Sequence, residues 1–245
     1  MSTHRVEDTV TVAAPNESLA SADLFALGRQ AAMARDGHSG RRGTFARARQ
    51  LLADGSWRGP RDAAESWIEE ADVVAVGGAP AVRAAGVELV IVSRDVAQVS
   101  AAHDAGLRVV WRAGFREGEG DAVRLERLAE LERLAPRLWG VMPTPVGEPY
   151  GLDALRCFAL CRLTLPMVPH LLADVAALGP RLAQMAFGFG ADELWGPIVA
   201  ERALRLGANA DNPALTRKEA ATLIRGAGLS PCERLADGTV EEVAP

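Results

Sequence analysis

Apolar residues recur at helical spacing in several stretches of the chain. Between residues 21 and 37, Leu24, Leu27 and Ala31 share one face, and this spacing predicts a helix that ends near Gly37. The clearest periodic stretch is 121–135, where leucines lie along one side. Similar patterns predict further helices over residues 61–71, 95–105, 152 onward, 170–178, 191 onward and 216–227.

Short apolar runs alternate with these helices. Runs of this kind, bounded by glycine or proline, are typical of buried strands in a parallel sheet. They predict strands over residues 43–47, 72–76, 87–93, 107–111, 138–142 and 183–189. Strands that alternate with helices imply right-handed crossovers and a parallel sheet. The pattern therefore predicts an α/β fold, a partial or compacted TIM-type barrel of about six parallel strands with surrounding helices and a helical C-terminal region.

The two ends of this pattern define the expected domain organisation. Residues 1–19 are polar without periodicity and predict a flexible N-terminal arm, whereas residues 20–245 are expected to form a single barrel domain. The first residues contain no apolar signal-peptide core, and no apolar run approaches the ~20 residues that span a bilayer. Three cysteines are too few for a disulfide framework. We therefore expect a cytoplasmic protein without a membrane partner.

Charge and motif content remove several function classes. The formal net charge is −5 and the pI about 5.5, which argues against a nucleic-acid partner. Lys218 is the only lysine among 27 basic residues, which indicates a coding bias more than a phosphate-binding design. The sequence contains no HExxH, GxSxG, Walker A or GxGxxG motif. Its four histidines are scattered, so no metal site is predicted.

Three separated motifs in the second half carry a family resemblance. They are Val168-Pro169-His170, the stretch GPRLAQMAFGFGADELWG at 179–196, and LTRKEAATLIRGAGLSPCER at 215–234. In this order they resemble the C-terminal parts of aminofutalosine synthase and cyclic dehypoxanthine futalosine synthase. These are radical-SAM enzymes of the futalosine route to menaquinone, and the deazaflavin-cofactor synthase is similar. The resemblance is strong from about residue 150 and moderate before it, and implies a barrel that binds S-adenosylmethionine beside an iron–sulfur cluster.

The chain departs from this family where the cluster would be held. Family members carry CxxxCxxC after the first strand, and the three thiolates bind three irons of a [4Fe–4S] cluster. Residues 44–57 contain no cysteine. Cys157 and Cys161 have the first two spacings but fall in a predicted helix, and Cys232 is far away in the sequence. Radical-SAM activity and an iron–sulfur cofactor are therefore not expected, whereas binding of an S-adenosylmethionine-like ligand stays open.

A second departure concerns polar residues. Aligned on Val168-Pro169-His170, the family's Asp-Asn pair becomes Pro166-Met167, and its lysine becomes Leu172. Active sites need preorganised charge and hydrogen bonding. The replacements predict lost or altered catalysis.

Six residues are candidates for ligand binding. The resemblance implies that His170 lies near the barrel mouth, where it could bond a ribose or carboxylate, or else it is a structural residue at a helix start. Gly77 and Gly78 end a predicted strand, a position that holds the cofactor's amino group in radical-SAM enzymes; a tight turn is the alternative.

The other three candidates are Arg112, Thr144 and Gln184. Arg112 closes a predicted strand and could meet an anion. Thr144 follows the next strand, and Gln184 belongs to the retained LAQ motif. Each also has an ordinary structural reading, as a solvated, turn or packing side chain.

Three hypotheses follow from these observations. The first is a non-catalytic radical-SAM-like protein that binds a small molecule or a homologous partner enzyme, linked to menaquinone metabolism. The second is a barrel enzyme with non-radical lyase or isomerase chemistry, which predicts titratable residues gathered at the carboxyl ends of the strands. The third is purely a partner subunit of a complete paralogue. Self-association into a homo-oligomer is left open.

Overall fold

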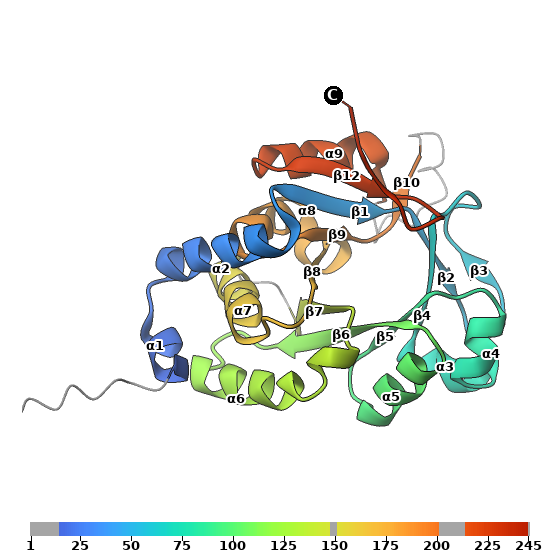
Figure 1. Ribbon diagram of the computed structural model, residues 1–245, viewed down its shortest axis with the longest axis horizontal. Coiled ribbons are helices and arrows are strands. Elements are labelled where there is room, and N and C mark those ends of the chain that lie inside the picture. The colour runs from blue at the N-terminus through green and yellow to red at the C-terminus, as the bar shows by residue number, and fades with distance from the viewer. Residues whose placement is uncertain (1–14, 148–150, 201–213, 245) are drawn as a thin grey trace, which may run out of the picture.

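The computed structural model describes residues 15–147, 151–200 and 214–244, in which strands alternate with helices (Figure 1). The strands that build the main sheet are β1 (Arg42–Ala46), β2 (Ala48–Leu51), β3 (Trp57–Arg58), β4 (Glu65–Glu69), β5 (Leu89–Val92), β6 (Arg108–Phe115), β7 (Gly140–Pro145), β8 (His170–Asp174), β9 (Glu193–Trp195), β12 (Ser230–Arg234) and β13 (Val240–Glu242). A small separate ladder pairs β10 (Ile198–Val199) with β11 (Leu215–Thr216).

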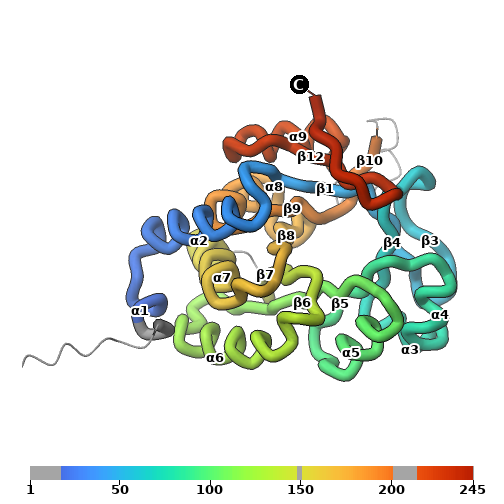
Figure 2. Tube along the Cα trace, viewed as in Figure 1, coloured from blue at the N-terminus to red at the C-terminus, as the bar shows by residue number. Residues whose placement is uncertain are grey.

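The main sheet curls so that its two ends approach each other. Its order is β13-β12-β1-β9-β8-β7-β6-β5-β4-β2-β3, so β1 and β2 lie near opposite ends of the order. Only Arg47 separates them in the chain. Because a single residue links β1 to β2, the sheet must curl to bring these two strands together. Apart from the antiparallel edges β3 and β13, the pairings are parallel, and the result is a TIM-type partial barrel (Figure 2).

Helices surround this barrel. They are α1 (Pro15–Ser21), α2 (Leu24–Ser39), α3 (Glu70–Val76), α4 (Ala79–Ala84), α5 (Val96–Asp104), α6 (Asp121–Glu132), α7 (Gly151–Thr164), α8 (Val175–Ala186) and α9 (Arg217–Gly226), with short 3₁₀ turns η1 (Ala135–Arg137) and η2 (Phe187–Phe189). The larger apolar core lies between helices and the outer faces of the strands; Leu27, Phe45 and Phe158 are fully buried there. Asp95 and Thr216 cap α5 and α9 with their side chains.

A second, smaller apolar cluster fills the inside of the barrel. Its members are Ala48, Leu89, Ile91, Val110, Met142, Leu172 and Trp195, with Trp67 and Trp139 packed against them. Trp67 and Trp195 meet edge to face with ring centroids 5.8 Å apart. Large side chains therefore occupy the middle of the barrel, as they do in TIM barrels generally.

The predicted helix over 61–71 and strand over 72–76 are wrong, and the true order is reversed. Residues 65–69 form β4 and residues 70–76 form α3. In this strand Trp67 and Ile68 point to opposite sides, Trp67 into the barrel and Ile68 into the outer core. As a result, Gly77 and Gly78 lie between α3 and α4 rather than at a strand end.

A second error affects residues 170–189. The segment expected to begin as a helix begins as β8, and the strand expected over 183–189 belongs to α8 and η2. The helix expected from residue 191 is instead β9 and β10, as far as residue 200. The C-terminal region contains α9, as predicted, and also β12, which pairs with β1.

The last residues of the predicted N-terminal arm belong to a helix. Helix α1 begins at Pro15, and Leu19 packs against the outer core. Residues 1–14 lie outside the described part. Among the described helices, none has both the length and the apolar character needed to cross a bilayer.

Candidate functional site

The carboxyl ends of the barrel strands form a polar mouth, which we define as Glu69, Arg112 and Asp174 with their neighbours. Arg112 Nη2 lies 2.7 Å from Glu69 Oε1, and its Nη1 lies 2.9 Å from Glu69 Oε2. Both side chains are about one-quarter exposed, at 28% and 27%. This two-point ion pair joins β6 to β4 over the intervening strand β5, and it fixes the plane of the guanidinium.

Asp174 is the third charged group of the mouth and ends β8. Its Oδ1 accepts a hydrogen bond of 2.9 Å from the Ala176 backbone N–H, which caps α8. Burial raises the pKa of Asp174 above its usual value, while the Ala176 amide and the charge of Arg112 act in the opposite direction. A carboxylate with a raised pKa accepts a proton more readily than an exposed one, and perturbed carboxyls of this kind gather at functional sites.

Glu70 organises the loop that follows β5. Its Oε2 accepts from the Ser93 amide at 2.7 Å, the Ser93 hydroxyl at 2.8 Å and the Arg94 amide at 3.1 Å, and its Oε1 accepts from the Asp95 amide at 2.7 Å. Burial acts to raise the pKa of Glu70, but these hydrogen bonds outweigh it, so the pKa is lowered. The loop is thus held rigidly beside the mouth.

The sequence candidates are divided between different parts of the molecule. The strands predicted to end before Arg112 and Thr144 continue to Phe115 and Pro145, so both residues lie in the second halves of their strands. Thr144 Oγ1 donates to the Met142 carbonyl at 3.1 Å. Gln184 lies on α8, where its side chain contacts Gly226 of α9, away from the strand ends. Together with Gly77 and Gly78, it stands outside the mouth.

His170 lies at the opposite end of the barrel from the mouth. It is the first residue of β8, paired with the first residue of β7, whereas the resemblance implied a position near the mouth. Its Nδ1 lies 2.8 Å from Asp192 Oδ2, and its ring stacks on Trp139 with centroids 4.4 Å apart. Residues at the amino-terminal face of a barrel usually serve stability rather than chemistry.

Around His170 lies a buried ion network at the amino-terminal base, which we call the base network. Its members are Glu65, Arg108, Arg162, His170, Asp192, Glu193 and Arg234. Asp192 Oδ1 accepts from Arg162 Nη2 and from the Leu171 amide, both at 2.6 Å. Arg234 Nη1 donates to Glu65 at 2.7 Å and to Glu193 at 3.0 Å, so it joins β12 to β4 and β9.

The base network makes stability depend on pH through His170. Burial lowers the pKa of His170, but the hydrogen bond to Asp192 and the charges of Glu193 and Asp192 outweigh it, so the pKa is raised above 6.5. The stability that protonated His170 contributes is fully present below the pKa it has in the unfolded state. It is lost as the pH rises through the pKa of the folded state. Between about pH 6 and about pH 9, wild type should therefore lose stability relative to His170→Gln, measured by urea unfolding at each pH. An unchanged difference between the two proteins would refute this role.

The described cysteines do not fit an iron–sulfur cluster. Cys157 and Cys161 are buried on α7, in the outer layer, and Cys232 lies on β12 beside β1. Burial raises the pKa of all three thiols, that of Cys161 to about 12, whereas cluster ligands are thiolates. After β1 the chain passes through Arg47 to β2 and then makes a cysteine-free turn at 52–56. Within the described ranges, no three His, Cys, Asp or Glu side chains gather as metal ligands.

Taken together, fold and site define a TIM-type partial barrel with a charged mouth and a filled interior. A stretch of 84 residues, 34% of the chain, is 37% identical to aminodeoxyfutalosine synthase of Thermus thermophilus and covers 23% of it. The enzyme of the same name from Streptomyces coelicolor is 36% identical over 85 residues, 34% of this chain and 22% of the relative. The chain therefore has homologues in the futalosine pathway over part of its length, which confirms the resemblance.

A third relative matches a longer stretch. Over 156 residues, 56% of the chain, there is 28% identity to 5-amino-6-(D-ribitylamino)uracil–L-tyrosine 4-hydroxyphenyl transferase 1 of Methanosarcina barkeri, of which 42% is covered. The chain spans less than half the length of these curated relatives. No protein-family model matches it.

Solved structures of radical-SAM enzymes share the fold. Methylornithine synthase (PylB) superposes with a TM-score of 0.62 at 11% identity, over 88% of this chain and 92% of that one. The hydrogenase maturase HydG of Carboxydothermus hydrogenoformans gives 0.60 at 11% identity, over 88% and 74%. This confirms the predicted TIM-type partial barrel.

Sequence reasoning missed Glu69 and Asp174. Both were placed within predicted helices, so neither was recognised as a residue at the end of a strand. One signal in the sequence could have revealed Asp174. The apolar run from Leu171 to Ala173 is followed by this acidic residue, two positions before Ala176, which is a spacing typical of a helix N-cap.

Proposed function

We propose that this protein is a radical-SAM-like barrel that binds a small molecule at its mouth without radical chemistry, in or near menaquinone metabolism. The observation that carries the proposal is the separation of two features. Charged groups suited to a ligand lie together at the mouth, whereas the sulfur ligands needed for a cluster are dispersed over α7 and β12.

The charges of the mouth favour a ligand with a cationic group. Glu69 pairs with Arg112, Asp174 lies within the influence of both charges, and Glu70 holds the loop after β5. Glu70 is occupied by backbone donors and Glu69 by Arg112, which leaves Asp174 as the carboxyl best able to meet an ammonium or sulfonium. An anionic ligand would have to compete with Glu69 for Arg112. The filled interior restricts such a ligand to the rim.

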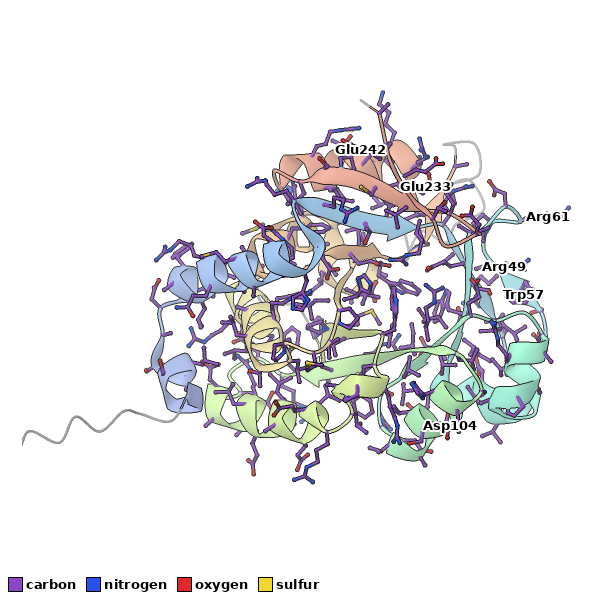
Figure 3. The ribbon with its side chains drawn as sticks, in the orientation of Figure 1. Arg49, Trp57, Arg61, Asp104, Glu233 and Glu242 are labelled. Atoms are coloured by element: carbon purple, nitrogen blue, oxygen red, sulfur yellow. The ribbon has the colours of Figure 1, made fainter. Side chains whose placement is uncertain are left out.

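S-adenosylmethionine is the natural probe, because it carries both an ammonium and a sulfonium group. Isothermal titration of the iron-free, full-length protein should show binding that needs no metal. Asp174→Asn keeps a residue able to cap α8 but removes the charge, and should weaken binding about tenfold. Asp104→Asn, at an exposed position at the end of α5 (labelled in Figure 3), should leave the affinity unchanged.

Two results would overturn this proposal. Wild-type protein that takes up no S-adenosylmethionine would exclude the proposed ligand class. Equal affinities of wild type and Asp174→Asn would show that any binding occurs away from the mouth.

One observation supports a second candidate, a barrel enzyme with non-radical lyase or isomerase chemistry. That hypothesis required titratable groups at the carboxyl ends of the strands, and Glu69, Arg112 and Asp174 meet this requirement. The raised pKa of Asp174 would suit a general acid. If wild-type protein converts the bound ligand without iron and reductant, and Asp174→Asn does not, the result would favour an enzyme over a protein that only binds its ligand.

A further inference from the structure

The strand β3 forms one edge of the main sheet. It stands at the end of the strand order and pairs with β2, where Arg58 lies opposite Gln50 and Trp57 opposite Leu51. Trp57 and Arg58 are both exposed, and in the described part of the chain no strand pairs with their other side. Figure 1 shows β3 at the outer margin of the sheet. An uncovered edge of this kind is a template for another strand.

The backbone of Trp57 faces the uncovered side. The Ser56 carbonyl accepts a hydrogen bond of 2.9 Å from the Leu52 amide, so Ser56 turns its polar groups toward β2. In an antiparallel pair, successive residues turn these groups alternately toward the partner strand and away from it. The amide and carbonyl of Trp57 therefore point away from β2. A strand that adds to this edge would form its backbone hydrogen bonds with Trp57.

Three arginines lie around Trp57. The guanidinium carbon of Arg49 is 4.2 Å from the centre of the Trp57 ring, a cation–π contact. Arg58 follows Trp57 on β3, and Arg61 lies in the loop before β4. Figure 3 shows the labelled residues Arg49, Trp57 and Arg61 together at this margin of the molecule. We call these four residues the β3 edge.

The arginines of the β3 edge form no ion pair with a carboxylate of the described residues. The acidic side chains close to them in the sequence are engaged elsewhere. Asp54 accepts hydrogen bonds from the Ser56 amide at 2.9 Å and from its hydroxyl at 2.6 Å, and Asp62 pairs with Arg47. The formal net charge of the chain is −5, so this edge is a basic patch on an acidic protein. Charge complementarity favours an acidic partner.

The two residues of β3 define the side chains that an added strand would carry. Trp57 and Arg58 point to opposite faces of the sheet. A strand paired with β3 would place alternate side chains beside the Trp57 ring and beside the Arg58 guanidinium. A β-branched apolar residue suits the ring, and a carboxylate suits the guanidinium. The edge therefore favours a segment in which acidic and apolar residues alternate.

We propose that the β3 edge binds an extended acidic segment of a partner protein, which adds to the sheet as a strand antiparallel to β3. Arg58 and Arg61 meet its carboxylates, and Trp57 supplies the backbone hydrogen bonds. A peptide fits better than a nucleic acid, because phosphates can accept from the Trp57 amide but donate nothing to its carbonyl. The site contains none of the mouth residues Glu69, Arg112 and Asp174, so it stands apart from the function proposed above.

A set of matched peptides tests this site. The probe is a nonapeptide of alternating glutamate and valine, capped at both ends and labelled with an uncharged dye, and fluorescence anisotropy follows its binding to full-length protein at low ionic strength. Exchange of its glutamates for glutamines should weaken binding about tenfold, because several exposed ion pairs are lost together. Added salt should weaken the binding of the glutamate peptide as well.

Backbone methylation separates strand addition from simple charge attraction. In an antiparallel pair, the peptide residue opposite Trp57 carries its side chain on the face of Trp57 and exchanges both backbone hydrogen bonds with it. That residue is a valine of the probe. N-methylation of the valine amides should therefore abolish binding, whereas N-methylation of the glutamate amides should leave it nearly unchanged.

Variants of the protein locate the binding. Arg58→Ser should weaken it about threefold to fivefold and Arg58→Lys much less, since lysine keeps the charge. Arg29→Ser, at an exposed position of α2, is the matched control and should leave the affinity unchanged.

Four results would overturn the proposal. They are no binding of the glutamate peptide, equal binding of the glutamine peptide, equal binding of the two methylated peptides, and undiminished binding by Arg58→Ser. Single-stranded DNA that binds more tightly than the peptide and is released by the same variant would assign the edge to nucleic acid instead.

Discussion

Replacing Arg234 by methionine is expected to destabilise the protein by about 3–5 kcal/mol, the loss typical of a buried ion pair that loses one partner. Arg234 is buried and its guanidinium neutralises Glu65 and Glu193, which are 3% and 0% exposed. Its guanidinium carbon also lies 4.7 Å from the centre of the Trp139 ring. Methionine fills similar space but leaves two buried carboxylates in contact with fewer cations.

Urea unfolding followed by circular dichroism measures this loss as a change in the free energy of unfolding. Arg61→Met is the matched control, because Arg61 is exposed in the loop before β4 (labelled in Figure 3). It should change stability by no more than about 0.5 kcal/mol. Adding Glu193→Gln to Arg234→Met should recover part of the loss, because one unpaired charge is removed. A loss below about 1 kcal/mol for Arg234→Met would contradict the role given to the base network.

The second large effect is expected for Trp195→Ala, also about 3–5 kcal/mol. Trp195 is 6% exposed and fills the inside of the barrel, where it meets Trp67. Alanine would lose the burial of the indole and leave a cavity that neighbouring strands cannot collapse to fill.

Trp57→Ala is the control for this substitution. Trp57 lies on the edge strand β3, is 38% exposed and stacks under Arg49, whose guanidinium carbon is 4.2 Å from its ring centre (Figure 3). Trp57→Ala should lower the free energy of unfolding clearly less than Trp195→Ala does. If Trp195→Ala were as mild as Trp57→Ala, the interior of the barrel would be less filled than we describe.

The misassigned strand β4 shows what local sequence could not reveal. Residues 65–69 contain three charged or polar side chains around Trp67 and Ile68, a pattern that favours an amphipathic helix. They form a buried strand because Glu65 is neutralised by Arg234, 169 residues later in the chain. No local pattern contains that partner. Strands with continuous apolar runs, such as β5 and β7, needed no distant partner and were predicted correctly.

Dependence on partners distant in the sequence also explains which site residues could be predicted and which could not. Arg112 and Thr144 follow apolar runs that read as strands, and they lie in the second halves of β6 and β7. His170 was assigned to a helix start, so its position at the first residue of a strand, and therefore at the base, could not be foreseen. Asp192 is its partner only because β8 and β9 pair.

The cysteine argument needed no fold at all, because a missing residue type is visible in the sequence. The fold adds where the three cysteines lie. Cys157 and Cys161 lie on α7 in the outer layer, and Cys232 lies on β12 beside β1. The absence of thiolates where a cluster would bind is the central claim, since the proposed non-radical function depends on it.

Anaerobic reconstitution of the full-length protein with iron and sulfide tests this claim most directly. We expect no [4Fe–4S] absorption or electron paramagnetic resonance signal, and no 5′-deoxyadenosine from S-adenosylmethionine under dithionite. Aminodeoxyfutalosine synthase of Thermus thermophilus, treated in parallel, is the positive control. A [4Fe–4S] signal that disappears in Cys157→Ser or Cys161→Ser, or the formation of 5′-deoxyadenosine, would contradict the account.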